Sequence, residues 1–128
     1  MSTILLVEDD RFLRRAGEAC LTQRGFRVVT AVDGDEALTM VRRERPDLIL
    51  LDLLMPKRSG LEVLRLIKGD DDLRGLRVII MSNSSRNEDV REVLALGALA
   101  YWVKADISLR QLGDRVQALL ADEATTAP

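Results

Sequence analysis

Five short apolar runs, each followed by an amphipathic stretch, recur along the chain about 25 residues apart. They cover residues 3–7, 27–31, 48–51, 78–81 and 100–103. The runs are aliphatic and mostly lack polar alternation, which is typical of parallel strands buried on both faces. The stretches between and after them predict helices over 11–24, 35–44, 60–68, 88–96 and 109–121. Alternating units of this length predict an α/β fold, a doubly wound five-stranded parallel sheet with helices on both faces.

Helix starts are marked by residues that can hydrogen-bond free backbone N–H groups. Three segments match the capping box, in which Ser stands three residues before Glu or Gln: Ser59 to Glu62, Ser85 to Glu88 and Ser108 to Gln111. We therefore expect one domain over residues 1–121, followed by a flexible tail over 122–128.

Composition excludes several classes of function. A net charge of −2 and a pI near 5.2 provide no basic face, so we expect no direct binding of nucleic acid. The chain has no histidine, which excludes a histidine base or metal ligand, and its one cysteine cannot form an intramolecular disulfide. No segment approaches the roughly 18 apolar residues of a membrane span. No basic region precedes the first apolar run, so a cytoplasmic protein without membrane association is expected.

Acidic residues follow two of the predicted strands. Asp52 comes directly after the run 48–51, and Glu8, Asp9 and Asp10 come directly after the run 3–7. Ligands of open α/β sheets bind beyond the carboxyl ends of the strands. Acids from two strands at one edge would repel each other unless a divalent cation neutralised them, and oxygen ligands suit Mg²⁺. The sequence therefore predicts a magnesium site there.

Two further strand ends carry groups that suit phosphoryl transfer. Ser82 follows the fourth run and Lys104 follows the fifth. In this interpretation Asp52 is a nucleophile that accepts a phosphoryl group, Asp9 and Asp52 hold Mg²⁺, and Lys104 and Ser82 contact phosphoryl oxygens.

Each residue alone has a simpler explanation. Acids at positions 8–10 complement the dipole of a helix start, and Asp52 alone fits a turn. Ser82 alone is a loop hydroxyl, and Lys104 alone is a solvated lysine. The order of acid pair, acid, hydroxyl and lysine on four strand ends favours the phosphoryl site.

These residues resemble the receiver domain of two-component response regulators, over residues 3–121. The matching segments are Leu6 to Asp10, Pro46 to Asp52, Met55-Pro56, Ser59-Gly60, Ser82, Gly97-Ala98 and Tyr101 to Lys104. The resemblance implies a flavodoxin-like (βα)5 fold and a phosphoacceptor role for Asp52. It also implies that Asp9 and Asp52 bind Mg²⁺ directly and that Glu8 contacts the ion through water.

The resemblance assigns three more positions. The backbone carbonyl of Leu54 would complete the protein ligands of Mg²⁺. Ser82 stands at the Thr/Ser switch position of the family, and Tyr101 stands at its aromatic switch position.

Two positions depart from the family pattern. Ala105 follows Lys104 where the family usually has proline in a cis bond, and a cis bond to alanine would cost about 2.5–4 kcal/mol. We therefore expect a trans bond and a different approach of Lys104. Asn83 replaces a very small residue, so it could narrow access to the site or add a hydrogen bond.

The leading hypothesis is a single-domain, chemotaxis-regulator-like receiver. A sensor histidine kinase or phosphotransfer protein would phosphorylate Asp52, and the chain would catalyse only its own phosphorylation and dephosphorylation. The face made by the fourth helix, fifth strand and fifth helix would bind a downstream protein target, and a homodimer is also allowed. A receiver belonging to a longer protein stays open.

Two other classes of protein compete with the receiver. A receiver-like scaffold that binds a partner without phosphorylation is the main alternative, and the intact acids and Lys104 argue against it. A phosphatase of the haloacid dehalogenase kind needs a second aspartate two residues after the nucleophile, where this chain has Leu54.

Overall fold

The apolar runs form the strands of one parallel sheet in the computed structural model, which describes residues 1–126 and the side chains of residues 1–121. The elements are β1 (Thr3–Val7), α1 (Arg11–Gln23), β2 (Arg27–Ala31), α2 (Gly34–Glu44), β3 (Leu48–Asp52), α3 (Gly60–Lys68), β4 (Val78–Ser82), α4 (Asn87–Ala95), β5 (Ala100–Val103), the 3₁₀ helix η1 (Lys104–Asp106) and α5 (Leu109–Thr126). The predicted doubly wound fold is confirmed.

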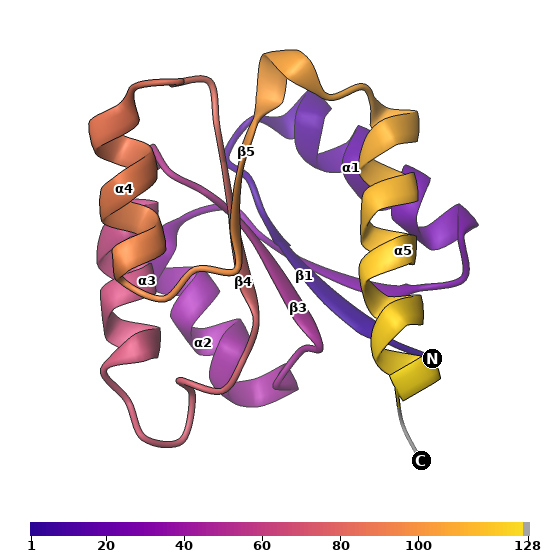
Figure 1. The fold of residues 1–128 in the computed structure, drawn as a ribbon, viewed down its shortest axis with the longest axis horizontal. Coiled ribbons are helices and arrows are strands. Elements are labelled where there is room, and N and C mark those ends of the chain that lie inside the picture. Colours follow the sequence, from indigo (N-terminus) through magenta and orange to yellow (C-terminus); the bar gives the residue numbers. More distant parts are fainter. Residues whose placement is uncertain (127–128) are drawn as a thin grey trace.

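The strand order is β2-β1-β3-β4-β5, so β1, β3, β4 and β5 are consecutive neighbours. Helices α1 and α5 cover one face of the sheet, and α2, α3 and α4 cover the other (Figure 1). The register pairs Val7 with Leu51, Asp52 with Met81, and Ser82 with Val103. This register brings the carboxyl ends of four strands to one edge of the sheet.

Alternate residues of the buried strands supply two cores. Leu5, Val7 and Ile49 pack in the core beneath α2, α3 and α4, whereas Ile4 and Leu6 pack in the core beneath α1 and α5. All five are at most 4% exposed. Burial on both faces explains why these runs lack the polar alternation of a half-exposed strand.

In two of the three predicted capping boxes, side chains form hydrogen bonds with backbone N–H groups at the helix start, as expected. The Ser59 hydroxyl accepts from the Glu62 N–H at 3.2 Å. The Ser108 hydroxyl accepts from the Gln111 N–H at 3.1 Å, and the Gln111 side chain accepts from the Ser108 N–H at 2.8 Å.

The capping box predicted at Ser85 is wrong. Helix α4 begins at Asn87, and its N-cap residue, Arg86, makes no side-chain hydrogen bond to the helix start. Ser84, one residue before the predicted cap, accepts from the Arg86 N–H instead, at 3.3 Å. The loop after β4 therefore runs one residue further than a cap at Ser85 implies, while α4 begins one residue before its predicted start at 88.

Helix α5 continues to Thr126, five residues past its predicted end at Ala121. The expected flexible tail over 122–128 stays a prediction, and residues 127–128 lie outside the described part of the chain. Within the described residues, no helix is long and apolar enough to cross a membrane.

Candidate functional site

Three carboxylates and one ammonium meet at the carboxyl edge of the sheet, and we call them the charged cluster: Glu8, Asp9, Asp52 and Lys104. Glu8 and Asp9 follow β1, Asp52 is the last residue of β3, and Lys104 follows β5. Glu8 is 5% exposed and Asp52 is 7% exposed, so both charges lie largely out of water. The fold thus assembles the predicted acids and lysine from three strand ends.

Lys104 joins the two buried carboxylates. Its Nζ lies 2.6 Å from Glu8 Oε1 and 3.2 Å from Asp52 Oδ2. The backbone N–H of Asp10 donates to the other oxygen of Glu8 at 3.2 Å. The contact with Glu8 is the shorter one, so Glu8 is already engaged by a cation of the protein itself.

Burial and repulsion make Asp52 a weak acid. Burial, together with the nearby Glu8 carboxylate, raises the pKa of Asp52 to about 7, although Lys104 acts in the opposite direction. For Lys104, burial opposes the charge, but the hydrogen bond to Glu8 and the attraction of Asp52 outweigh it. The pKa of Lys104 therefore lies above its usual value. A second cation near these carboxylates would favour the ionised form of Asp52.

The three carboxylates can supply oxygen ligands to one ion. One oxygen each from Glu8, Asp9 and Asp52 lies within 4.8 Å of the other two. Hard oxygen donors with one exposed side, at Asp9, suit a divalent cation that keeps several waters. The donor set therefore fits Mg²⁺.

The loop after β3 is held close to Asp52 by a glycine. A Cβ at Gly60 would overlap the carbonyl oxygen of Asp52, and the Gly60 N–H donates to Leu53 O at 2.8 Å. The Leu54 N–H lies 3.4 Å from Asp52 Oδ1, and the Leu54 side chain is 72% exposed. Leu54 thus lies beside Asp52, and its role as a carbonyl ligand stays a prediction.

A second group of residues lies one strand away, and we call it the hydroxyl corner: Ser82, Ser84 and Tyr101. Ser82 ends β4, is 1% exposed, and accepts from the Ser84 N–H at 3.1 Å. The Tyr101 hydroxyl, from β5, donates to the Ser84 carbonyl oxygen at 2.8 Å. The two residues expected to form a switch are therefore connected through Ser84.

Sequence reasoning missed Ser84 and Arg14. Arg14 Nη1, from α1, donates to the carbonyl oxygens of Glu8 at 3.0 Å and Asp9 at 3.3 Å, which fixes the backbone that carries both acids. A basic residue in a first helical turn gives no signal of this role. Ser84 lies in a run of polar loop residues, in which Ser82 matched a strand end and Ser85 matched a capping box, whereas Ser84 matched neither pattern.

The two departures from the family pattern have local consequences. The bond between Lys104 and Ala105 is trans, as predicted, and both residues belong to η1. Ala105 and Lys104 line a cavity of about 250 Å³ beside the charged cluster, between α1 and α5. The Asn83 side chain is exposed and also lines this cavity. Of the three carboxylates, only that of Asp9 belongs to an exposed residue.

Known proteins share this fold and sequence. The model of the response regulator receiver domain matches residues 4–117. The transcriptional regulatory protein AfsQ1 of Streptomyces coelicolor is 41% identical over 122 residues, which is 94% of this chain and 52% of AfsQ1. The polar-differentiation response regulator DivK of Brucella anthropi is 31% identical over 120 residues, which is 94% of this chain and 97% of DivK. The phosphorylated cyanobacterial phytochrome response regulator RcpA, whose structure is solved, is 35% identical in sequence. Its structure superposes with a TM-score of 0.82, and the match covers 99% of this chain and 96% of the RcpA chain.

The chain belongs to the response regulator receiver domain family. It is a phosphoacceptor receiver domain of two-component signalling. The chain spans about half the length of AfsQ1 but nearly all of DivK.

Proposed function

We propose that Asp52 is the phosphoacceptor, within a receiver domain that covers residues 1–121. The observation that carries this proposal is the position of the Asp52 carboxylate, among two other carboxylates and 3.2 Å from the Lys104 ammonium. An Asp52 oxygen would attack the phosphorus of a phosphohistidine or of a small phosphodonor. The bond from phosphorus to the donor would break, the donor would leave with its electron pair, and an acyl phosphate would remain on Asp52.

Asp9 and Asp52 would bind Mg²⁺ directly, Glu8 would contact it through water, and the Leu54 carbonyl would complete the protein ligands. Magnesium would supply positive charge to the phosphoryl oxygens. The 2.6 Å contact between Lys104 and Glu8 supports an indirect role for Glu8, because a full positive charge already occupies one of its oxygens.

Lys104 and Ser82 would contact the phosphoryl group after transfer. Lys104 Nζ lies 3.2 Å from Asp52 Oδ2, so it stands beside the carboxylate that would carry the phosphoryl group. The Ser82 hydroxyl accepts from the Ser84 N–H, which leaves its own proton free to donate. These contacts, with Mg²⁺, would let the chain catalyse its own phosphorylation and dephosphorylation, and we propose that it does so in the cytoplasm.

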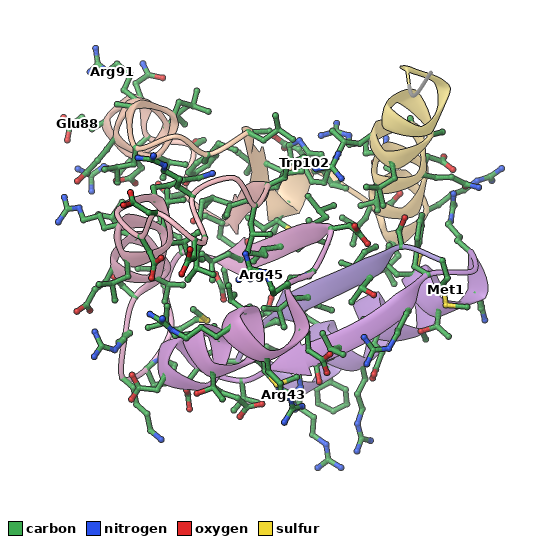
Figure 2. The ribbon with its side chains drawn as sticks, turned by 90° about the horizontal axis from the view of Figure 1, so that it is seen from below. Met1, Arg43, Arg45, Glu88, Arg91 and Trp102 are labelled. Atoms are coloured by element: carbon green, nitrogen blue, oxygen red, sulfur yellow. The ribbon has the colours of Figure 1, made fainter. Side chains whose placement is uncertain are left out.

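A downstream protein would bind the face formed by α4, β5 and α5. Trp102 lies on β5 between these two helices, while Glu88 and Arg91 project outward from α4 (Figure 2). The Arg115 guanidinium, on α5, lies 5.4 Å from the centre of the Trp102 ring. Leu94, near the end of α4, and Leu99, just before β5, are nearly half exposed, so they would offer apolar area to a downstream target or a second copy of the chain.

The test is incubation with acetyl phosphate and Mg²⁺, followed by intact mass measurement. The wild-type chain should gain one phosphoryl group, and Asp52→Asn should gain none. Asp106→Asn is the matched control, because Asp106 is an exposed acid in η1. An unmodified wild-type chain that still responds to Mg²⁺ would support the scaffold alternative instead.

A further inference from the structure

Ser84 makes hydrogen bonds to three parts of the fold. Its backbone N–H donates to Ser82 at the end of β4, and its carbonyl oxygen accepts from Tyr101 on β5. Its hydroxyl donates to Asp89 Oδ2, in the first turn of α4, at 2.7 Å. This last contact is the shortest of the three, and both side chains are partly buried. The contacts at Ser84 therefore connect the residues of the expected switch to a helix of the partner face.

The hydroxyl of Ser84 also binds the residue that precedes α4. The N-cap residue Arg86 offers no side-chain acceptor to the helix, whereas the Ser84 hydroxyl accepts from the Arg86 N–H at 3.3 Å. With the bond to Asp89, the Ser84 side chain contacts α4 both before and within its first turn. The neighbouring Ser85 is exposed. The position of α4 relative to this loop thus depends on Ser84 in particular.

We propose that Ser84 and Asp89 are positioning residues that set the resting orientation of Tyr101 and the start of α4. The hydrogen bond between their side chains holds the Ser84 backbone in place, and that backbone supplies the acceptor for the Tyr101 hydroxyl. Without the bond, the loop and the Tyr101 ring lose their single resting position. The consequence for signalling rests on the proposed function: movement of Ser82 toward a phosphoryl group would pull on Ser84, and Asp89 would transmit that pull to α4.

The chain contains a single tyrosine and a single tryptophan, so both can be observed without assigning other residues of their type. Protein labelled with ¹³C at the hydroxyl-bearing ring carbon gives one signal that reports the hydrogen bond of Tyr101. In the unphosphorylated protein, Ser84→Ala and Asp89→Ala should each shift this signal. Each should also speed exchange of the Val90 amide, which donates to Arg86 O at the start of α4, by roughly fivefold to tenfold, the effect of one lost hydrogen bond.

Conservative variants separate the hydrogen bond from other effects. Ser84→Thr keeps a hydroxyl donor and Asp89→Asn keeps an oxygen acceptor, so both should retain the wild-type tyrosine signal and exchange rate. Ser85→Ala is the matched control and should change neither. A tyrosine signal in Ser84→Ala that equals that of Ser85→Ala overturns the proposal. So does an Asp89→Asn variant that behaves like Asp89→Ala, because the charge at the helix start would then be responsible.

The phosphorylated state tests the signalling part. At matched phosphoryl content, the change in the tyrosine signal on phosphorylation should fall to less than half of the wild-type change in Ser84→Ala, and a full change contradicts coupling through Ser84. If the wild-type chain takes up no phosphoryl group on Asp52, the proposed function fails. The measurements on unphosphorylated protein still decide whether Ser84 and Asp89 position Tyr101.

Discussion

The charged cluster and the hydroxyl corner lie on neighbouring strand ends but are stabilised in opposite ways. In the charged cluster, two of the three carboxylates, Glu8 and Asp52, share the ammonium of Lys104, and the pKa of Asp52 rises to about 7. In the hydroxyl corner, neutral hydroxyl and backbone groups of Ser82, Ser84 and Tyr101 satisfy one another at 2.8–3.1 Å.

This difference in stabilisation assigns the two groups different roles: the charged cluster suits the phosphoryl chemistry, and the hydroxyl corner suits the transmission of its result. Excess negative charge destabilises the charged cluster, so a cation or a change of pH acts on it strongly. The hydrogen bonds among Ser82, Ser84 and Tyr101 join neutral groups, so they respond mainly to geometry, while the Ser84 hydroxyl also donates to the Asp89 carboxylate. One edge of the sheet therefore places an electrostatically sensitive site beside a hydrogen-bonded one that can report its state.

The largest expected effect is the loss of Mg²⁺ binding in Asp9→Ala. Removing one of two direct carboxylate ligands should lower Mg²⁺ affinity and the rate of phosphorylation by acetyl phosphate roughly 100-fold. Titration with Mg²⁺ while recording amide spectra measures the first effect. Asp10→Ala is the control, because Asp10 is an exposed neighbour whose carboxylate accepts from the Leu13 N–H at the start of α1. An unchanged titration in Asp9→Ala would remove Asp9 from the metal site.

Asp52→Asn should stabilise the fold above pH 7. The pKa of Asp52 is raised from 3.8 to about 7 in the folded chain, so the folded chain binds this proton more tightly than the unfolded chain does. Stability should therefore fall as the pH rises from about 4 to about 7. Because the variant carries no ionisable group there, it should gain on the order of 2 kcal/mol at pH 8 and almost nothing near pH 4. Urea unfolding at both pH values measures this, and a gain independent of pH contradicts the raised pKa.

Lys104→Met should strengthen Mg²⁺ binding by about tenfold, because it removes a positive charge that repels the ion and releases Glu8. The same variant should lose most of the conformational response to phosphorylation, since the ammonium would contact the phosphoryl group. Lys57→Met is the control, because Lys57 pairs with Asp33 instead. Weaker Mg²⁺ binding in Lys104→Met would show that the ammonium organises the carboxylates rather than competing for them.

The smallest effect is expected in the hydroxyl corner. Ser82→Ala removes the acceptor of the Ser84 N–H and should cost about 1 kcal/mol of stability, equally at pH 5 and pH 8. At matched phosphorylation, the fluorescence of Trp102 should also respond less than in the wild type. A response equal to that of the wild type would remove Ser82 from the switch.

The sequence predicted the strands and most of the charged cluster because both depend on local order. Runs such as 48–51 are buried on both faces, and a residue that directly follows such a run, as Asp52 does, must lie at the carboxyl edge. Contacts between distant segments were less predictable. The 2.6 Å pair of Lys104 with Glu8 joins residues 96 positions apart, and no local pattern specifies which carboxylate the lysine prefers.

The hydroxyl corner shows why the start of α4 and the contacts of Ser84 could not be predicted from the sequence. Ser85 matched a capping box, yet the helix begins at Asn87 and Ser84 makes the contacts, because Tyr101 and Asp89 fix the path of the loop. Those partners lie on β5 and in α4, so the tertiary fold overrides the local preference. Helix α5 likewise extends to Thr126 because residues 122–126 contain no glycine or proline that would mark an earlier helix end.

The central claim is that the Asp52 carboxylate itself accepts the phosphoryl group, and locating the modified residue tests it most directly. After incubation with acetyl phosphate and Mg²⁺, borohydride reduces an acyl phosphate to the alcohol, so the acceptor aspartate becomes homoserine. Peptide mapping should find this change at Asp52 alone, with Ser82 and Asp9 unmodified. A phosphoryl group found on Ser82 or another hydroxyl, with Asp52 unreduced, would contradict the account.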